Sequence, residues 1–178
     1  MKKPMAWWQQ VWVRFVVGLV VLLVAGSIFG AVLLTQAAPE QPIQFPHRTH
    51  IALGAQCLYC HPAAAWGPVA SLPSPEKCWG CHQQVQKKSP ELDKLAAYVK
   101  AGQSIPWVPV AIQPDFVHFN HRPHVARGIE CKTCHGDLAK MTVAEPQPRQ
   151  NMGWCLDCHK RMEPSQFARL SDCSTCHY

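Results

Sequence analysis

All ten cysteines of the chain lie in five copies of one pattern, Cys-x-x-Cys-His. This pattern is the attachment motif of a c-type haem. Its two thiols form thioethers to the porphyrin, and its histidine becomes the proximal ligand of the iron. Because no cysteine is left over, we expect five covalently bound haem c groups.

The motifs assign a role to fifteen residues. The thioether positions are Cys57, Cys60, Cys78, Cys81, Cys131, Cys134, Cys155, Cys158, Cys173 and Cys176. The proximal iron ligands are His61, His82, His135, His159 and His177. Structural zinc is an alternative, but a histidine next to the second cysteine is poorly placed to share its zinc, and five pairs do not form whole Cys₄ sites. A disulfide scaffold leaves the histidines unexplained.

Four of the other five histidines stand in a repeated segment, Phe-x-His-x-x-His. The residues from Phe45 to His61 align without a gap with those from Phe119 to His135, and nine of the seventeen positions are identical. This similarity indicates an internal duplication of a haem-binding unit. A doubled histidine pair before a doubled attachment motif predicts distal iron ligands. These four candidates are His47, His50, His121 and His124.

The fifth distal ligand stays open at this point. His118 would complete a set of five distal histidines, but no equivalent histidine precedes Phe45. Met141 and Met152 are alternatives, because a thioether ligand would raise the potential of one haem above that of its neighbours. A vacant fifth position, which would suggest catalysis, is a further alternative.

The haem count also bears on the fold. Removing the first 34 of 178 residues leaves 144 residues. These are too few to enclose five haems and also to build an ordinary core of side chains. We therefore predict a mostly irregular and α-helical fold with a haem-packed core and little regular secondary structure. Sixteen prolines agree with this prediction. One soluble helix is expected to begin at the N-cap Ser89, followed by Pro90, and to end at Gly102.

The N-terminal segment reads as a membrane anchor. Phe15–Leu34 is a run of twenty residues without a charge, and at about 1.5 Å per residue it can span a bilayer core of about 30 Å. Lys2, Lys3 and Arg14 precede it, so the positive-inside rule places the N-terminus in the cytoplasm. A cleaved signal peptide is the alternative, but the apolar run is long and Thr35-Gln-Ala37 is a mediocre cleavage site.

From these features we predict a single-pass protein of the inner membrane with its haem domain on the periplasmic side. Residues 1–35 form the cytoplasmic tail and transmembrane helix, and 36–44 form a linker. Residues 45–105 form a first half with two haems, and 106–178 form a second half with three. The net charge of +6 does not predict nucleic-acid binding, because no basic patch with interleaved aromatic residues stands out.

The repeated segment resembles that of the small class III cytochromes c, in which Phe-x-His-x-x-His precedes Cys-x-x-Cys-His. The chain resembles more closely the pentahaem cytochrome c subunit of bacterial alternative complex III. The features that match are the N-terminal helix, the five motifs, and the runs Pro114–His121 and Met152–His159. The resemblance to the class III cytochromes covers most of the chain from Phe45 onward, whereas the resemblance to the pentahaem subunit concerns the chain as a whole.

This resemblance implies a quinol-oxidising respiratory or photosynthetic membrane complex. In it, a pentahaem subunit passes electrons from an iron–sulfur subunit towards a monohaem cytochrome c or another periplasmic acceptor, alongside membrane subunits. The sequence itself predicts no catalytic residues, because no Ser-His-Asp group, carboxylate pair or phosphate-binding loop stands out. The resemblance also implies mostly bis-histidine haems with methionine on one, which favours Met152 or Met141 without removing His118. The rival functions are a membrane-anchored quinol dehydrogenase of the tetrahaem type and a multihaem reductase.

Overall fold

The computed structural model of the chain describes residues 6–35, 38–85, 88–147 and 150–178. The chain divides into two compact units, Met1–Ala37 and Ala38–Tyr178. Every regular element in the described ranges is a helix, and no strand occurs in them. This confirms the predicted helical class.

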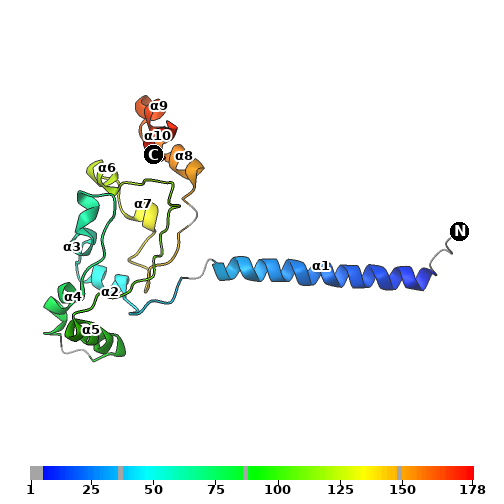
Figure 1. The fold of residues 1–178 in the computed structure, drawn as a ribbon, viewed down its shortest axis with the longest axis horizontal. Coiled ribbons are helices and arrows are strands. Elements are labelled where there is room, and N and C mark those ends of the chain that lie inside the picture. Colours follow the sequence, from blue (N-terminus) through cyan, green and yellow to red (C-terminus); the bar gives the residue numbers. More distant parts are fainter. Residues whose placement is uncertain (1–5, 36–37, 86–87, 148–149) are drawn as a thin grey trace. The chain divides into compact units, whose positions relative to one another are not determined.

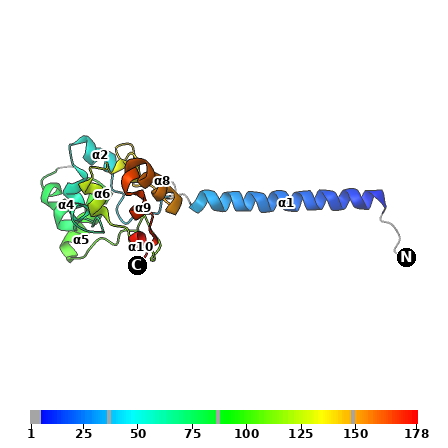
Figure 2. The ribbon, with the colours of Figure 1, turned by 90° about the horizontal axis from the view of Figure 1, so that it is seen from above.

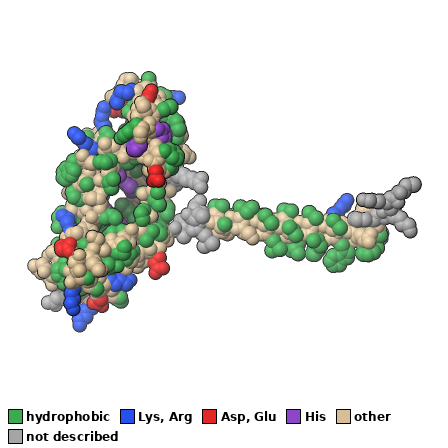
Figure 3. Space-filling model, in the orientation of Figure 1, with side chains coloured by type: hydrophobic (Ala, Val, Ile, Leu, Met, Phe, Trp, Pro, Cys, Tyr) green, Lys and Arg blue, Asp and Glu red, His purple; other side chains and the backbone are tan. Residues whose placement is uncertain are grey.

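The described part of the first unit is one long helix, α1 (Trp7–Thr35). Its visible side chains are almost all hydrophobic (Figure 3). An 18-residue window within Trp7–Val32 has a mean hydropathy of 2.7, and the length and composition of the stretch suit a membrane span or a signal sequence. Arg14 lies on α1. Lys2 and Lys3, and Gln36 and Ala37 of the candidate cleavage site, lie outside the described residues.

The second unit consists of short helices joined by irregular segments (Figures 1 and 2). In chain order the helices are α2 (His47–Ala52), α3 (Cys57–Cys60), the 3₁₀ helix η1 (Pro62–Ala65), α4 (Pro75–His82), α5 (Pro90–Ala101), α6 (His121–Ala126), α7 (Lys132–His135), α8 (Met152–Met162), the 3₁₀ helix η2 (Pro164–Gln166), α9 (Phe167–Leu170) and α10 (Cys173–Cys176). Most of them span one or two turns, because attachment motifs, prolines and glycines follow one another closely.

Side-chain caps begin the longer helices of this unit. The Ser89 hydroxyl accepts a hydrogen bond from the Leu92 amide at 3.3 Å, and Pro90 occupies the first helical position of α5. Gly102 ends α5 with φ at +62°, a conformation that glycine adopts without strain. The helix expected between Ser89 and Gly102 is therefore confirmed. Ser74 begins α4 in the same way, accepting from the Lys77 amide at 3.4 Å.

Apolar side chains alone form only a small core in the described residues. Ile43, Leu95 and Ile105 make one buried cluster, against which parts of α4 and α5 pack. Ala64 is the fourth buried apolar side chain, and none of the described side chains is fully buried. A unit the size of Ala38–Tyr178 ordinarily buries far more.

The segment that follows α1 is packed where it is described. Ile43 belongs to the buried cluster, and the buried side-chain amide of Gln41 pairs with the backbone of Val108. Its Nε2 donates to the Val108 carbonyl at 2.8 Å, and its Oε1 accepts from the Val108 amide at 3.0 Å. Residues 38–44, which belong to the segment predicted as a linker, are thus part of the second unit.

Candidate haem-binding sites

Each attachment motif coincides with a helical turn. The turns of α3 and α10 run from the first to the second cysteine of their motifs, and α4 and α7 end at the histidine. Residues three apart on a helix share a face, so each pair of thiols points to one side. All ten cysteines are free of disulfides. In the described ranges no three His, Cys, Asp or Glu side chains converge on a common point, as a structural zinc site would require.

Six histidine rings are oriented by a backbone carbonyl. A carbonyl only accepts, so the Nδ1 that faces it carries the proton, and the Nε2 lone pair is left for a metal. The contacts are His50 to Pro46 at 3.0 Å, His61 to Ser71 at 2.7 Å, His121 to Pro68 at 2.6 Å, His124 to Asn120 at 2.8 Å, His159 to Leu170 at 3.3 Å and His177 to Phe116 at 2.8 Å. Three of these histidines are predicted proximal ligands and three are predicted distal ligands.

Proximal and distal histidines lie opposite one another in pairs. The ring centres are 5.9 Å apart for His50 and His82, 6.2 Å for His121 and His135, and 6.2 Å for His124 and His159. Two imidazoles that bind one metal through bonds of about 2.0 Å, with roughly 1.1 Å from nitrogen to ring centre, would have centres about 6.2 Å apart. The three separations therefore fit bis-histidine iron sites.

The repeat predicts a fourth pair. His47 and His61 are the counterparts of His121 and His135 in the other copy. The Nδ1 of His47 is buried without a hydrogen-bond partner among the described residues. Burial, followed by the charges of His61 and His50, lowers the pKa of His47 to about 4.

The surroundings of these rings favour their neutral form. Burial is the main reason that the pKa values of His82, His124 and His135 lie below the usual range. The charge of the opposite histidine adds to the effect in each case, from His50, His159 and His121 respectively. Neutral imidazole is the form that binds a metal.

Two phenylalanines bridge neighbouring distal histidines. The Phe45 ring centre is 4.7 Å from that of His47 and 4.3 Å from that of His50. In the second copy, the Phe119 ring centre is 4.8 Å from that of His121 and 4.7 Å from that of His124. The sequence interpretation gave neither phenylalanine a role. Each phenylalanine stands two and five residues before a histidine in both copies, and this repetition could have indicated a shared role.

The fifth motif lies beside the segment that precedes the second copy. The His118 amide donates to the Cys176 carbonyl at 2.8 Å, and the His118 ring stacks on Tyr178 with 4.3 Å between centres. The Phe116 ring faces His177 with centres 5.8 Å apart. Of the three candidate ligands, His118 is thus brought next to this motif by backbone contact.

The two methionine candidates lie elsewhere on the chain. The backbone carbonyl of Met141 accepts from the Arg48 amide at 3.1 Å, which places this residue beside α2. Met152 begins α8, and its side chain is 59% exposed.

Comparison with known proteins agrees with this geometry. The family described as cytochrome c7 and related cytochrome c matches residues 117–178. The menaquinone reductase multihaem cytochrome c subunit of Nitratidesulfovibrio vulgaris strain Hildenborough is 34% identical over 188 aligned positions, which cover 92% of this chain and 88% of the relative. This chain is a multihaem cytochrome c. The family match contains the second copy of the repeat and the last three attachment motifs of the cytochrome.

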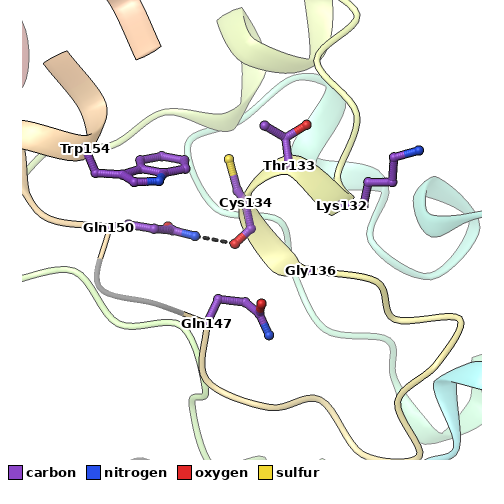
Figure 4. Close-up of a pocket in the computed structure, with 7 residues that line it drawn as sticks. All are labelled: Lys132, Thr133, Cys134, Gly136, Gln147, Gln150 and Trp154. Atoms are coloured by element: carbon purple, nitrogen blue, oxygen red, sulfur yellow. Dashed lines mark hydrogen bonds between the residues drawn. The ribbon is translucent and has the colours of Figure 1, made fainter. Parts of the chain in front are cut away.

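A small cavity of about 130 Å³ adjoins the third motif of this cytochrome (Figure 4). Trp154 of α8 and Cys134 border it, and the Gln150 side-chain amide donates to the Cys134 carbonyl. Gly136 follows the motif with φ at +70°, and a Cβ at this position would meet the side chain of Gln147. The cavity therefore lies between the third motif and Trp154, the residue before the fourth motif, and the indole ring of Trp154 could pack against a haem there.

Proposed function

We propose that this cytochrome is a membrane-anchored pentahaem electron carrier within a complex that exchanges electrons with the quinone pool. The observation that supports it best is the set of histidine pairs with ring centres about 6 Å apart. The small side-chain core adds support, because haems would supply the apolar interior that the described residues lack. Bound haem supplies reversible one-electron chemistry at iron.

The residues of the chain hold and tune these groups. The ten motif cysteines form the thioethers, and four iron sites are closed by the pairs His47 with His61, His50 with His82, His121 with His135, and His124 with His159. For His177 we propose His118 as the partner, supported by its backbone bond to Cys176. Met152 and Met141 stay as alternatives. Backbone carbonyls that hold Nδ1 fix the ring orientations and raise ligand basicity.

The complex itself is proposed from the relatives. The relative from N. vulgaris bears the name of a subunit, which supports partner subunits for this cytochrome as well. We propose an iron–sulfur subunit as donor, a monohaem cytochrome c or other periplasmic protein as acceptor, and membrane subunits, as in alternative complex III. α1 would anchor the cytochrome in the inner membrane, with the haem unit on the periplasmic side.

The experiment compares the isolated cytochrome with the complex purified from membranes. A pyridine haemochrome assay should give five haems per chain. A menaquinol analogue should reduce these haems rapidly in the complex and not in the isolated cytochrome. Reduction of the isolated cytochrome would instead support a quinol dehydrogenase of the tetrahaem type, and fewer than five haems would contradict the assignment.

The name of the relative favours a second candidate, in which electrons flow towards menaquinone. In that case the prereduced complex should reduce a menaquinone analogue faster than the oxidised complex accepts electrons from the quinol. The resting spectrum of the cytochrome should be entirely low-spin in both cases. A high-spin signal would indicate an open iron position and a reductase.

A further inference from the structure

The two copies of the repeat exchange backbone hydrogen bonds reciprocally. Two amides at the start of α2 donate to carbonyls shortly after α7, and two amides at the start of α6 donate to carbonyls shortly after η1. The four bonds are His47 to Thr142 at 3.1 Å, Arg48 to Met141 at 3.1 Å, His121 to Pro68 at 3.3 Å and Arg122 to Gly67 at 3.2 Å. We call these four bonds the reciprocal clasp.

The clasp has the symmetry of a two-fold interface. Its acceptors stand six and seven residues after His61, the last residue of the first copy, and six and seven residues after His135, the last residue of the second. Its donors are equivalent positions of the repeat as well. In a two-fold contact, residue i of one unit meets residue j of the other and the reverse also holds. The two copies within this chain meet in the same way.

The first and third attachment motifs meet at the centre of this arrangement. The Nδ1 of His121, whose ring faces His135 of the third motif, lies 2.6 Å from the carbonyl of Pro68, seven residues after His61 of the first motif. This contact agrees with the clasp, which joins the histidine-bearing segment before each of these two motifs to the segment that follows the other motif.

The second and fourth motifs extend outward from this centre. Phe45 links His47 to His50, which faces His82 of the second motif. The ammonium group of Lys77 in α4 also lies 3.9 Å above the ring of Tyr59 in α3. In the other copy, Phe119 links His121 to His124, which faces His159 of the fourth motif.

The residue before the repeated phenylalanine contacts α5 in the first copy and the fifth motif in the second. Gln44 and His118 are equivalent positions, each one residue before the repeated phenylalanine. The Gln44 amide donates to Glu91 of α5 at 2.7 Å, whereas the His118 amide donates to Cys176 at 2.8 Å. The fifth motif is tied to the fourth through α9, because His159 contacts the Leu170 carbonyl and Thr175 donates to the Arg169 carbonyl at 2.8 Å.

We propose that the two copies form an internal two-fold pair and that the five attachment sites stand in single file in the order second, first, third, fourth, fifth. This order rests on the proposed function, since it defines the path along which the cytochrome would carry electrons. At one end of the row, α5 packs against the helix of the second motif, so no further haem site follows there. At the other end, the fifth site follows the fourth. The second and fifth sites are therefore the two ends of the path.

The order can be tested on the purified holoprotein by replacing one distal histidine at a time with methionine. The thioether raises the potential of that haem, so it can be reduced alone. Its magnetic coupling to adjacent ferric haems is then lost, and their EPR lines change. His50→Met should alter the lines of one other haem, and its equivalent His124→Met should alter the lines of two. His47→Met and His121→Met should each alter two.

A branched or reordered arrangement would give other numbers. Two altered haems with His50→Met, or three with His47→Met, would overturn the proposed order. If a variant loses its haem, the iron positions of the wild-type holoprotein from anomalous diffraction decide instead, and the second and fifth irons should each have one near neighbour. Neither measurement involves a quinone or a partner, so each outcome is independent of quinol exchange by the complex.

Discussion

The imidazole rings of His121 and His135 lie with centres 6.2 Å apart and planes 8° from parallel. One ring belongs to α6 and the other to α7, and Nδ1 of His121 is held by the Pro68 carbonyl of the other copy at 2.6 Å. By contrast, the planes of His50 and His82 are 63° apart. The two histidine pairs therefore differ in the relative orientation of their rings.

This difference should be visible by EPR. Crossed imidazole planes bring the iron dπ orbitals close in energy, which makes the g tensor of a ferric low-spin haem more anisotropic, and ligand geometry is one lever of the protein over its haem. We expect the His50–His82 site to give a more anisotropic signal than the His121–His135 site. His50→Met should remove the more anisotropic signal, and His121→Met should leave it. The reverse assignment would contradict the two ring geometries.

The bridging phenylalanines should each affect two sites. Phe119→Leu removes the ring that contacts His121 and His124, so we expect the EPR lines and midpoint potentials of the third and fourth haems to shift together. Phe45→Leu should shift those of the first and second. Phe116→Leu is the matched control, because the ring of Phe116 contacts one histidine of the described residues, His177, and does not bridge two. A shift confined to one haem in Phe119→Leu would contradict a bridging role.

The local geometry of the attachment motifs follows from the sequence, whereas haem attachment at these residues stays a prediction. Cys-x-x-Cys-His places its groups on one helical turn whatever surrounds it, and α5 was predicted from Ser89, Pro90 and Gly102. The start of α4 carries the same signal, Ser74-Pro75, and was missed because α4 ends within a motif and has no terminal glycine. α1 begins at Trp7, earlier than the charge-free run at Phe15, because one arginine on a helix does not end it.

The contacts between the copies could not be predicted in the same way. The reciprocal clasp joins backbone amides to backbone carbonyls, groups that every non-proline residue carries, so no residue type signals it. The same holds for the bond from the His118 amide to the Cys176 carbonyl, which favours His118 over Met141 and Met152 as a neighbour of the fifth motif. Residue identity alone had left these three open.

Glu91 should make the stability of the first copy depend on pH. Its hydrogen bond from Lys94, and then that from the Gln44 amide, lower its pKa below the usual 4.5. The folded state therefore favours the carboxylate, and this contribution is present above pH 4.5 and is lost as the pH falls through the lowered value. Glu91→Gln should reduce the free energy of unfolding by less than about 1 kcal/mol at pH 7.

The acid dependence separates this contact from general charge effects. Urea unfolding of the holoprotein at several pH values should show the difference between wild type and Glu91→Gln shrinking below pH 4.5. Asp93→Asn removes a carboxylate from the same first turn of α5 without touching Gln44 and serves as control. A difference that stays constant down to low pH would show that the Glu91 carboxylate makes no specific contact.

The reciprocal clasp should contribute to stability through backbone amides alone. Arg48→Pro removes the amide that donates to Met141 and leaves that carbonyl without its partner, whereas Arg48→Ala keeps the bond. Losing such a hydrogen bond costs about 1 to 3 kcal/mol. We expect urea unfolding of the holoprotein to show this loss for Arg48→Pro and a change within about 0.5 kcal/mol for Arg48→Ala.

The repeat itself supplies a control for the proline. Thr49 is equivalent to Pro123, so α6 already carries a proline at this place in its first turn. Thr49→Pro should therefore be tolerated, because its amide bonds only to the nearby Pro46 carbonyl at 3.1 Å. A proline at position 48 should cost clearly more than one at position 49, since only the former breaks a contact between the copies. Equal costs would mean that the clasp adds nothing to the stability of the cytochrome.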